Sequence, residues 1–215
     1  MDTLTNTRVL SPNPYFSQVA SEARINKAAE ALKANGIEAI VVQTGEEARA
    51  KVLELLPEGA EVYNSTSRTL DTIGLASDIE ESGTYQAVRP RLWQFDRTTQ
   101  ANEARKFGAA PDYVVGSVHA ITEQGQAIIA SASGSQIGVY ASGGGTVIWV
   151  VGAQKIVRDL EEGLRRIEEY SYPLEDARAR EAYGIGSGIN KVLIVNREFR
   201  PGRITAILVK ENLGF

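Results

Sequence analysis

Apolar residues recur along the chain at helical spacing and in short continuous runs, and the two patterns alternate. Helical spacing predicts a helix over residues 14–35, which ends at Gly36. The apolar, β-branched run 37–43 (IEAIVVQ) predicts a strand. Thr44 follows, with Glu47 three positions later, and this capping-box pattern predicts the start of the next helix. The chain therefore begins in helix–strand–helix order.

Further apolar runs predict the remaining strands. They are residues 61–63 and the runs that begin at Tyr113, Ala127, Thr146, Lys191 and Ile204. Most are apolar on successive residues, which is typical of strands covered on both faces. Strands separated by helices indicate a mainly parallel sheet in a three-layer α/β/α fold. We expect residues 1–215 to form one domain, with 1–13 as a flexible N-terminal segment.

Helices are predicted between these strands. They cover the stretch after residue 69 through Ile79, residues 100–107, a segment around 157–167 and residues 174–183. In the third, helical spacing predicts an inward face formed by Val157, Leu160, Leu164 and Ile167. The pairs Glu161–Arg165 and Glu162–Arg166 are then expected on its outer face, at i,i+4 spacing. Residues 83–97 show no regular pattern.

Composition and charge exclude several classes of protein. The 215 residues carry 23 Lys and Arg against 27 Asp and Glu, a net charge of −4 without any like-charged block, which disfavours nucleic-acid binding. The absence of cysteine rules out disulfides and cysteine-ligated iron–sulfur clusters in this chain, and we expect no cofactor of its own. No apolar run approaches the ~20 residues of a membrane helix, and no secretory signal is evident. We expect a cytoplasmic protein that binds no membrane.

Candidate chemistry is expected in the loops beyond the carboxyl ends of the strands, where ligands of open α/β sheets collect. The polar, glycine-rich loops are Asn64–Thr69, Gly116–Gln126, Ser131–Gly138, Ala141–Gly145 and Gly152–Lys155. In the first, the candidate ligand-binding residues are Ser65, Ser67, Arg68 and Thr69. Their hydroxyls and guanidinium, at the start of a helix, suit a phosphate or carboxylate. The alternative is a helix cap that needs no ligand.

The segment GSVHAITEQGQ contains the two candidate catalytic residues. Glu123, before Gly125, could act as general base or nucleophile, and the single histidine, His119, could share proton transfer. A structural, hydrogen-bonded histidine is the alternative for His119. Gly125 is included among the ligand-binding candidates.

Other candidate ligand-binding residues lie in later loops. Gly134, Ser135 and Gln136 permit a close approach of the backbone, and Lys155 follows a strand. A solvated lysine is the alternative at Lys155. The chain has neither GxGxxG nor a P-loop, and no convincing metal-ligand spacing, so we expect no metal site.

Several longer phrases resemble a known family. GSVHAITE, VVGAQKIV and PLED, within about 100 consecutive C-terminal residues, and more weakly SRTLDTIG, resemble the LUD-domain proteins related to the lactate-utilisation C subunit. The resemblance implies the fold of glucosamine-6-phosphate deaminase, ribose-5-phosphate isomerase and the CoA transferases. The sequence departs from the expected family pattern at Gln124, Gln126 and Ala177.

Three functions follow as hypotheses. The resemblance implies a cluster-free component of lactate or other 2-hydroxy-acid utilisation, working with iron–sulfur partner proteins. An alternative is a stand-alone enzyme on a phosphorylated or CoA-linked metabolite, with Glu123 as base or nucleophile. A further alternative is a catalytically silent ligand-binding module. In each case the expected ligand is a small anionic metabolite, and a homodimer is a candidate assembly.

Overall fold

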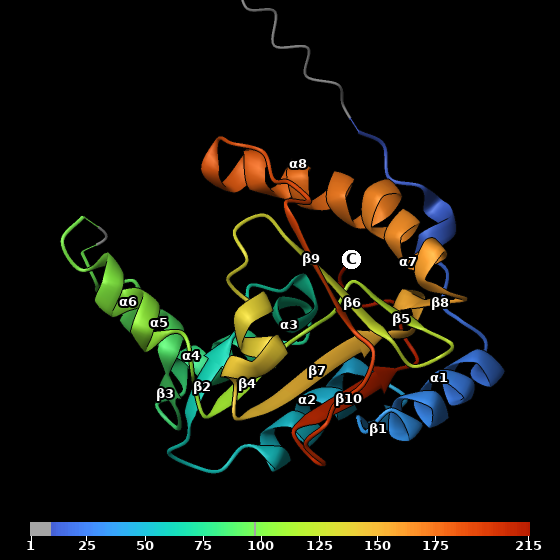
Figure 1. Cartoon of the computed structure of the whole chain (residues 1–215), viewed down its shortest axis with the longest axis horizontal. Helices are drawn as coiled ribbons and strands as arrows, with labels where there is room; N and C mark the ends of the chain where they lie inside the picture. The colour runs from blue at the N-terminus through green and yellow to red at the C-terminus, as the bar shows by residue number, and fades with distance from the viewer. Residues whose placement is uncertain (1–9, 97) are drawn as a thin grey trace, which may run out of the picture.

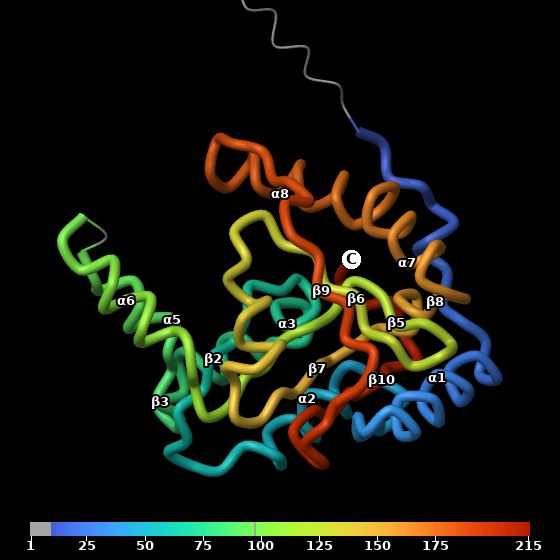
Figure 2. The backbone as a smooth tube through the Cα atoms, viewed as in Figure 1, coloured from blue at the N-terminus to red at the C-terminus, as the bar shows by residue number. Residues whose placement is uncertain are grey.

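The protein contains two β-sheets packed face to face, with helices outside them (Figures 1 and 2). The structure is a computed structural model that describes residues 10–96 and 98–215. The strands are β1 (Glu38–Val42), β2 (Glu61–Asn64), β3 (Gln86–Ala87), β4 (Tyr113–Gly116), β5 (Ala120–Thr122), β6 (Ala127–Ser131), β7 (Thr146–Gly152), β8 (Ile156–Val157), β9 (Lys191–Val195) and β10 (Ile204–Val209). The helices are α1 (Glu22–Ala34), α2 (Gly45–Leu55), α3 (Arg68–Thr72), α4 (Leu75–Glu81), α5 (Val88–Leu92), α6 (Ala101–Phe107), α7 (Leu160–Arg166) and α8 (Tyr172–Tyr183). Short helical turns cover Pro14–Ser17, Val139–Gly143, Ala153–Lys155 and Ile167–Ser171.

The larger sheet has six strands, all parallel, in the order β1-β10-β7-β4-β2-β3. The smaller sheet has the order β8-β5-β6-β9, and β6 runs antiparallel to both of its neighbours. The predicted α/β fold with a mainly parallel sheet is therefore confirmed. The second sheet was not predicted, because β5 and β8 are only three and two residues long.

Alternating strand residues separate the core into layers. On one face of the six-stranded sheet, Ile148, Val150 and Ile207 pack with Ala48 and Val52 of α2. The other face packs against α1 and the smaller sheet. The outer face of the smaller sheet packs against the segment that contains α7, while α5 and α6 project to one side of the molecule (Figure 1).

The predicted helix over residues 14–35 is wrong in part, because it is interrupted. Asn13 caps the turn Pro14–Ser17, and the chain is extended at Gln18 and Ser21 before α1 begins. In the gap, the N–H of Ala20 donates to the carbonyl of Ala153 (3.3 Å), which fixes the extended path. Of the predicted flexible segment, residues 1–9 lie outside the described residues, and Asn13 donates to Glu169 (2.7 Å).

The predicted inward face of the 157–167 helix is wrong in part, although Val157, Leu160 and Ile167 do pack in the core. Val157 belongs to β8, Leu164 is 38% exposed, and Glu162 and Arg166 are buried. Both buried charges have polar partners: the Glu162 carboxylate accepts from the Tyr15 hydroxyl (2.8 Å), and Arg166 donates to carbonyl and hydroxyl oxygens. Apolar spacing alone could not anticipate these partners.

Two further expectations differ from the structure. Strand β9 is covered on one face only, since Val192 and Ile194 are exposed. Residues 86–92 form β3 and α5 despite their irregular pattern. In the described ranges, no helix is both long and apolar enough to cross a membrane.

Candidate functional site

A pocket of about 290 Å³ opens at the carboxyl edge of the six-stranded sheet. The loops after β2, β4 and β7 contribute Ser65, Ser117 and Lys155, respectively, and the loop after β6 contributes Ser133. Strands β2, β4 and β7 are neighbours in one parallel sheet, so their carboxyl ends meet at the same edge. Four of the five predicted loops therefore contribute to the pocket.

The fifth predicted loop, Ala141–Gly145, lies elsewhere. It precedes β7, and the N–H of Gly145 donates to the carbonyl of Pro111, just before β4 (3.0 Å). This loop is therefore at the amino edge of the sheet, opposite the pocket.

The first wall of the pocket depends on a close approach at the end of β4. The hydroxyls of Ser65 and Tyr140 are 2.9 Å apart, and the Tyr140 hydroxyl donates to the carbonyl of Ser117 (3.2 Å). A Cβ atom on Gly116 would lie 1.7 Å from the Tyr140 hydroxyl oxygen. Glycine at this position is thus needed for the hydroxyl pair to form. Burial raises the pKa of Tyr140, which keeps its phenol protonated.

Lys155 is the most unusual residue of the pocket, because its side chain is only 1% exposed and has no carboxylate partner among the residues described. Its ammonium nitrogen Nζ donates to Thr69 Oγ1 (2.9 Å) and to Ser117 Oγ (3.0 Å). Burial, and then the charge of Arg166, lower its pKa well below the ordinary value. The alternative of a solvated lysine is excluded by this burial.

Arg166 is a second buried basic residue, beside the pocket. It donates to Gln154 O (3.2 Å), to His119 O (2.5 Å) and to Ser171 Oγ (3.0 Å). Its Nη2 is buried and has no hydrogen-bond partner in the described part of the chain. Burial lowers its pKa to about 10, so the guanidinium remains charged at neutral pH. Arg166 was not among the predicted site residues, because its i,i+4 spacing from Glu162 is typical of an ion pair on the surface of a helix.

His119 lines the pocket and is half-buried. Its Nδ1 accepts the N–H of Ala130 (3.2 Å), which places the proton of the neutral imidazole on Nε2. Burial, followed by the charges of Lys155 and Arg166, lowers its pKa to about 3. At neutral pH His119 is therefore a neutral hydrogen-bond donor.

The remaining predicted residues of these loops have several positions. Ser67, Arg68, Ser135 and Gln136 line the pocket. Thr69 lies behind the wall, where it accepts from Lys155 and donates to the carbonyl of Leu213 (3.1 Å). Gly134 does not line the pocket, and its φ of +91° allows its N–H to reach Ser131 Oγ (2.8 Å) in a tight turn.

Helix α8 forms a wall that sequence analysis did not predict. Tyr172, Glu175 and Arg178 line the pocket, and Arg178 is paired with Glu175 through two bonds of 2.7 Å. Asp176 accepts from Ser187 N (2.8 Å) and so holds the following loop at the pocket. The phrase PLED, which includes Glu175 and Asp176, was the available signal. Ala177 is exposed and does not line the pocket.

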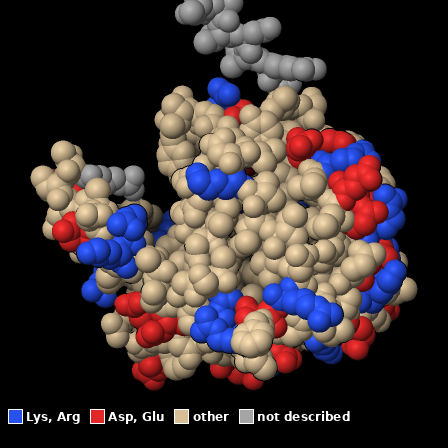
Figure 3. All heavy atoms as spheres, in the orientation of Figure 1, with Lys and Arg blue, Asp and Glu red and all other residues tan. Residues whose placement is uncertain are grey.

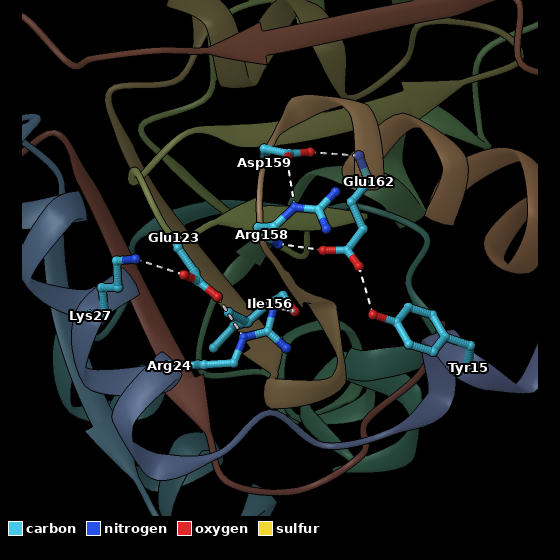
Figure 4. A network of polar contacts seen from close by, with 8 residues as sticks. All are labelled: Tyr15, Arg24, Lys27, Glu123, Ile156, Arg158, Asp159 and Glu162. Atoms are coloured by element: carbon cyan, nitrogen blue, oxygen red, sulfur yellow. Dashed lines mark hydrogen bonds and ion pairs between the residues drawn. The ribbon is translucent and has the colours of Figure 1, made fainter.

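Glu123 and Gly125 do not lie with the other predicted residues. His119 precedes β5 and Glu123 follows it, so the two candidates are at opposite ends of one strand. Figure 4 shows the Glu123 carboxylate between Arg24 (2.6 Å) and Lys27 (2.8 Å) of α1. Hydrogen bonds from Lys27 and Arg24 lower its pKa. The predicted loops that line the pocket lie around Lys155, and Glu123 is outside this group.

Gly125 has a structural position in the same turn. Its φ is +77°, and a Cβ atom there would lie 2.4 Å from the backbone of Ala31 in α1. Close packing of the β5–β6 turn on α1 requires glycine. Gln124 is exposed, and Gln126 donates to Asn196 (2.6 Å), so neither departure from the family pattern lies in the pocket.

Neither the charged residues on one face of the molecule nor the metal-ligating residues of the described chain form a second site. Acidic and basic residues intermingle at the margins of the face seen in Figure 3, whose centre is largely uncharged. Across residues 10–96 and 98–215, no group of three His, Cys, Asp or Glu side chains could hold a metal ion.

Comparison with known proteins identifies the family. The model of the LUD domain matches residues 25–209. The chain belongs to the LUD-domain family. A crystal structure of a DUF162 family protein from Deinococcus radiodurans is similar in fold, with a TM-score of 0.55 and 15% sequence identity over 88% of this LUD-domain chain and 99% of that one. Among curated proteins, none matches the sequence.

Proposed function

We propose that this LUD-domain protein binds a small 2-hydroxy- or 2-oxo-carboxylate in the Lys155 pocket, as a cluster-free component of lactate or related 2-hydroxy-acid utilisation. Two buried basic side chains support the proposal: the charged guanidinium of Arg166 and the amine of Lys155, neither of which contacts a carboxylate of the described chain.

A buried cation without a counter-ion is costly, on the order of several kcal/mol even after the protein relaxes. Arg178, also at the pocket, forms two hydrogen bonds with the carboxylate of Glu175. Its charge is therefore already neutralised within the protein, unlike that of Arg166. An anion bound in the pocket beside Lys155 would supply the negative charge that Arg166 lacks. The missing counter-ion favours an anionic ligand over a neutral one.

The size and lining of the pocket favour a small ligand with hydroxyl or carbonyl oxygens. Its volume of about 290 Å³ is at the lower end of the ~300–1,000 Å³ range of small-molecule sites. Ser117 and His119 can donate hydrogen bonds to oxygen atoms. A short hydroxy acid fits this description better than a CoA thioester.

The alternative enzyme with Glu123 as base or nucleophile has less support. That carboxylate is paired with two cations outside the pocket, and its lowered pKa disfavours proton uptake at neutral pH. Our proposal therefore assigns Glu123 no role in the binding of the metabolite.

A thermal-shift series tests the proposal. L-Lactate, pyruvate, a sugar phosphate, a CoA thioester and the neutral analogue lactamide would be compared on the wild type. We expect the short carboxylates to stabilise the protein, by about 2.7 kcal/mol at 100 times the dissociation constant. Lys155→Met should abolish the shift, whereas Lys33→Met, which changes an exposed lysine of α1, should not.

Two results would contradict the proposal: an equal shift with lactamide, or a full lactate shift in Lys155→Met. The association with partner proteins is tested separately, by pull-down with the tagged chain from cells grown on L-lactate. We expect a cysteine-rich iron–sulfur protein to be retained, and its absence would remove the partner from the proposal.

A further inference from the structure

The side-chain nitrogen of Lys155 is held in the pocket wall by two hydroxyl groups. Thr69 Oγ1 and Ser117 Oγ lie 2.9 and 3.0 Å from Nζ. The Thr69 hydroxyl is also 3.1 Å from the carbonyl of Leu213, to which it donates, so Thr69 accepts a hydrogen bond from Lys155. The two hydroxyl oxygens fix the direction of the nitrogen.

This arrangement accounts for two of the three substituent positions on the nitrogen. A neutral amine has two N–H groups and one lone pair, and the two hydroxyl oxygens can accept both N–H groups. No residue of the described chain forms a hydrogen bond at the third position, and Lys155 lines the pocket. The third position is thus available to a bound molecule.

The surroundings of Lys155 favour the neutral amine. Desolvation disfavours its charged form, and Arg166 adds a like charge with no carboxylate to offset it. Lys27 shows the contrast, because it is 61% exposed and paired with Glu123. A buried lysine beside another cation is a common setting for an amine nucleophile.

We propose that Lys155 forms a covalent imine with the carbonyl carbon of a 2-oxo acid bound in this pocket. This inference rests on the proposed function, and it names the oxo acid, the oxidised counterpart of a 2-hydroxy acid, as the reacting ligand. The carboxylate next to the carbonyl meets the need of the site for an anion, and a 2-hydroxy acid binds there without reacting.

The reaction balances without an oxidant or reductant. The lone pair of Nζ attacks the carbonyl carbon, and the carbonyl oxygen takes up the proton that the nitrogen loses, which gives a carbinolamine. Ser117 Oγ, 3.0 Å from Nζ, is placed to relay this proton. A further proton from solvent then converts the hydroxyl into a leaving water molecule, and the C=N bond forms as a protonated imine. The sum is one oxo acid, one amine and one proton, giving one iminium group and one water.

Reduction by borohydride tests the imine, because it converts the C=N bond into a stable secondary amine. The wild type would be incubated with pyruvate and sodium cyanoborohydride, and the product analysed by intact mass and peptide mapping. We expect one adduct per chain, on the peptide that contains Lys155. L-Lactate in excess should suppress the adduct by competition, and L-lactate without pyruvate should give none.

Variants separate a specific adduct from surface chemistry. Lys33→Met should retain the adduct in full, and Lys155→Met should lose it. Lys155→Arg replaces the reactive amine with a guanidinium, which does not form an imine, and should lose the adduct as well. Because peptide mapping on the wild type identifies the modified lysine directly, the test does not depend on the folding of any variant.

The outcomes distinguish this inference from the proposed function. A pyruvate-induced thermal shift without any reduced adduct would overturn the imine and leave the binding of 2-oxo acids intact. Absence of both the shift and the adduct would overturn both proposals. An adduct spread over exposed lysines such as Lys33, and equal in Lys155→Met, would also overturn the imine.

Discussion

At the scale of single residues, Lys155 and Arg166 show what sequence analysis can and cannot find. The position of Lys155 after a strand was sufficient to include it among the candidates, because parallel strands end at one edge of a sheet. The sequence gives no indication that the lysine is buried. For Arg166, the spacing from Glu162 suggested an outward ion pair, whereas both residues are buried with other partners.

Lys155→Met is expected to stabilise the ligand-free protein at neutral pH. The variant removes a buried amine that is neutral in the folded protein, although the same amine is protonated in the unfolded chain. The folded-state pKa lies below the ordinary value, so between the two pKa values the unfolded chain binds a proton that the folded chain does not. Wild-type stability should therefore fall as pH is lowered below about 10, by up to ~1.4 kcal/mol per pH unit, until the folded-state pKa is reached.

Urea denaturation at pH 7, 8 and 9 measures this effect. The dependence on pH should be weaker in Lys155→Met than in the wild type, and Lys33→Met should match the wild type. Equal pH dependence in all three proteins would show that the amine of Lys155 is charged in the folded state.

His119→Asn should reduce the loss of stability in acid. The folded-state pKa of His119 is about 3, against 6.5 for an unperturbed histidine, and burial is the main cause. As pH falls from about 6.5 towards 3, the unfolded chain gains a proton that the folded chain lacks, so stability falls by up to ~1.4 kcal/mol per unit. Asn retains an acceptor for the N–H of Ala130 but does not titrate.

Denaturation midpoints at pH 7, 6, 5 and 4 would measure the difference. The variant and the wild type should diverge progressively below pH 6.5. Parallel curves would mean that His119 takes up a proton in the folded protein as readily as in the unfolded chain.

At the scale of elements, apolar runs predicted the buried strands well and the outer elements poorly. Strands β4, β7 and β10 are buried by helices or strands on both faces, so their sequences are mainly apolar. Strand β9 has a similar apolar sequence, yet Val192 and Ile194 are exposed. Helix α7 was predicted only in part, since Leu160 packs inward as expected, but Leu164 is exposed and the charged residues Glu162 and Arg166 are buried.

The turn between β5 and β6 is an anchor for α1, and Glu123→Gln is expected to weaken that anchor without affecting the pocket. Lys27 and Arg24 are 61% and 37% exposed, so solvent screens the pairs and the expected loss is about 1 kcal/mol. Glu30→Gln is the matched control, because Glu30 is 76% exposed and, among the described residues, pairs only with Lys33. Urea denaturation and the lactate thermal shift provide the two measurements. Loss of the lactate shift in Glu123→Gln would return Glu123 to the binding site.

The end of β4 tolerates no side chain, and Gly116→Ala is expected to separate Ser65 from Tyr140. The added Cβ would lie 1.7 Å from the Tyr140 hydroxyl oxygen, so the ring must move within a packed core, at a cost of about 1–3 kcal/mol. Gly138→Ala is the control: no atom lies within 4 Å of its Cβ position, and its φ of −62° suits alanine. Urea denaturation compares them, and equal stability of the two variants would contradict the proposed packing.

At the scale of the whole molecule, the topology of the sheet predicted which loops lie together, but it did not predict that Lys155 is the residue at their centre. The rule for parallel sheets correctly placed the loops after β2, β4 and β7 together. It could not place Glu123, because β5 belongs to a second sheet, and β5 and its neighbour β8 are too short to be evident from the sequence. Helix α8 also lines the pocket, although it lies far along the chain from the other lining loops. The spacing of apolar residues predicts a helix there but does not predict where it packs.

Hydrogen–deuterium exchange with saturating L-lactate should therefore map a discontinuous footprint. Amides in residues 65–68, 117–119, 131–136 and 171–188 surround the pocket, and ligand binding should slow their exchange by suppressing local opening. Residues 123–125 and 141–145 lie away from it and serve as internal controls, since their exchange should not change. Protection confined to one loop would mean that the four segments do not share a ligand. Protection of 141–145 alone would place the ligand at the amino edge of the sheet, and the arrangement around Lys155 would then have no part in binding.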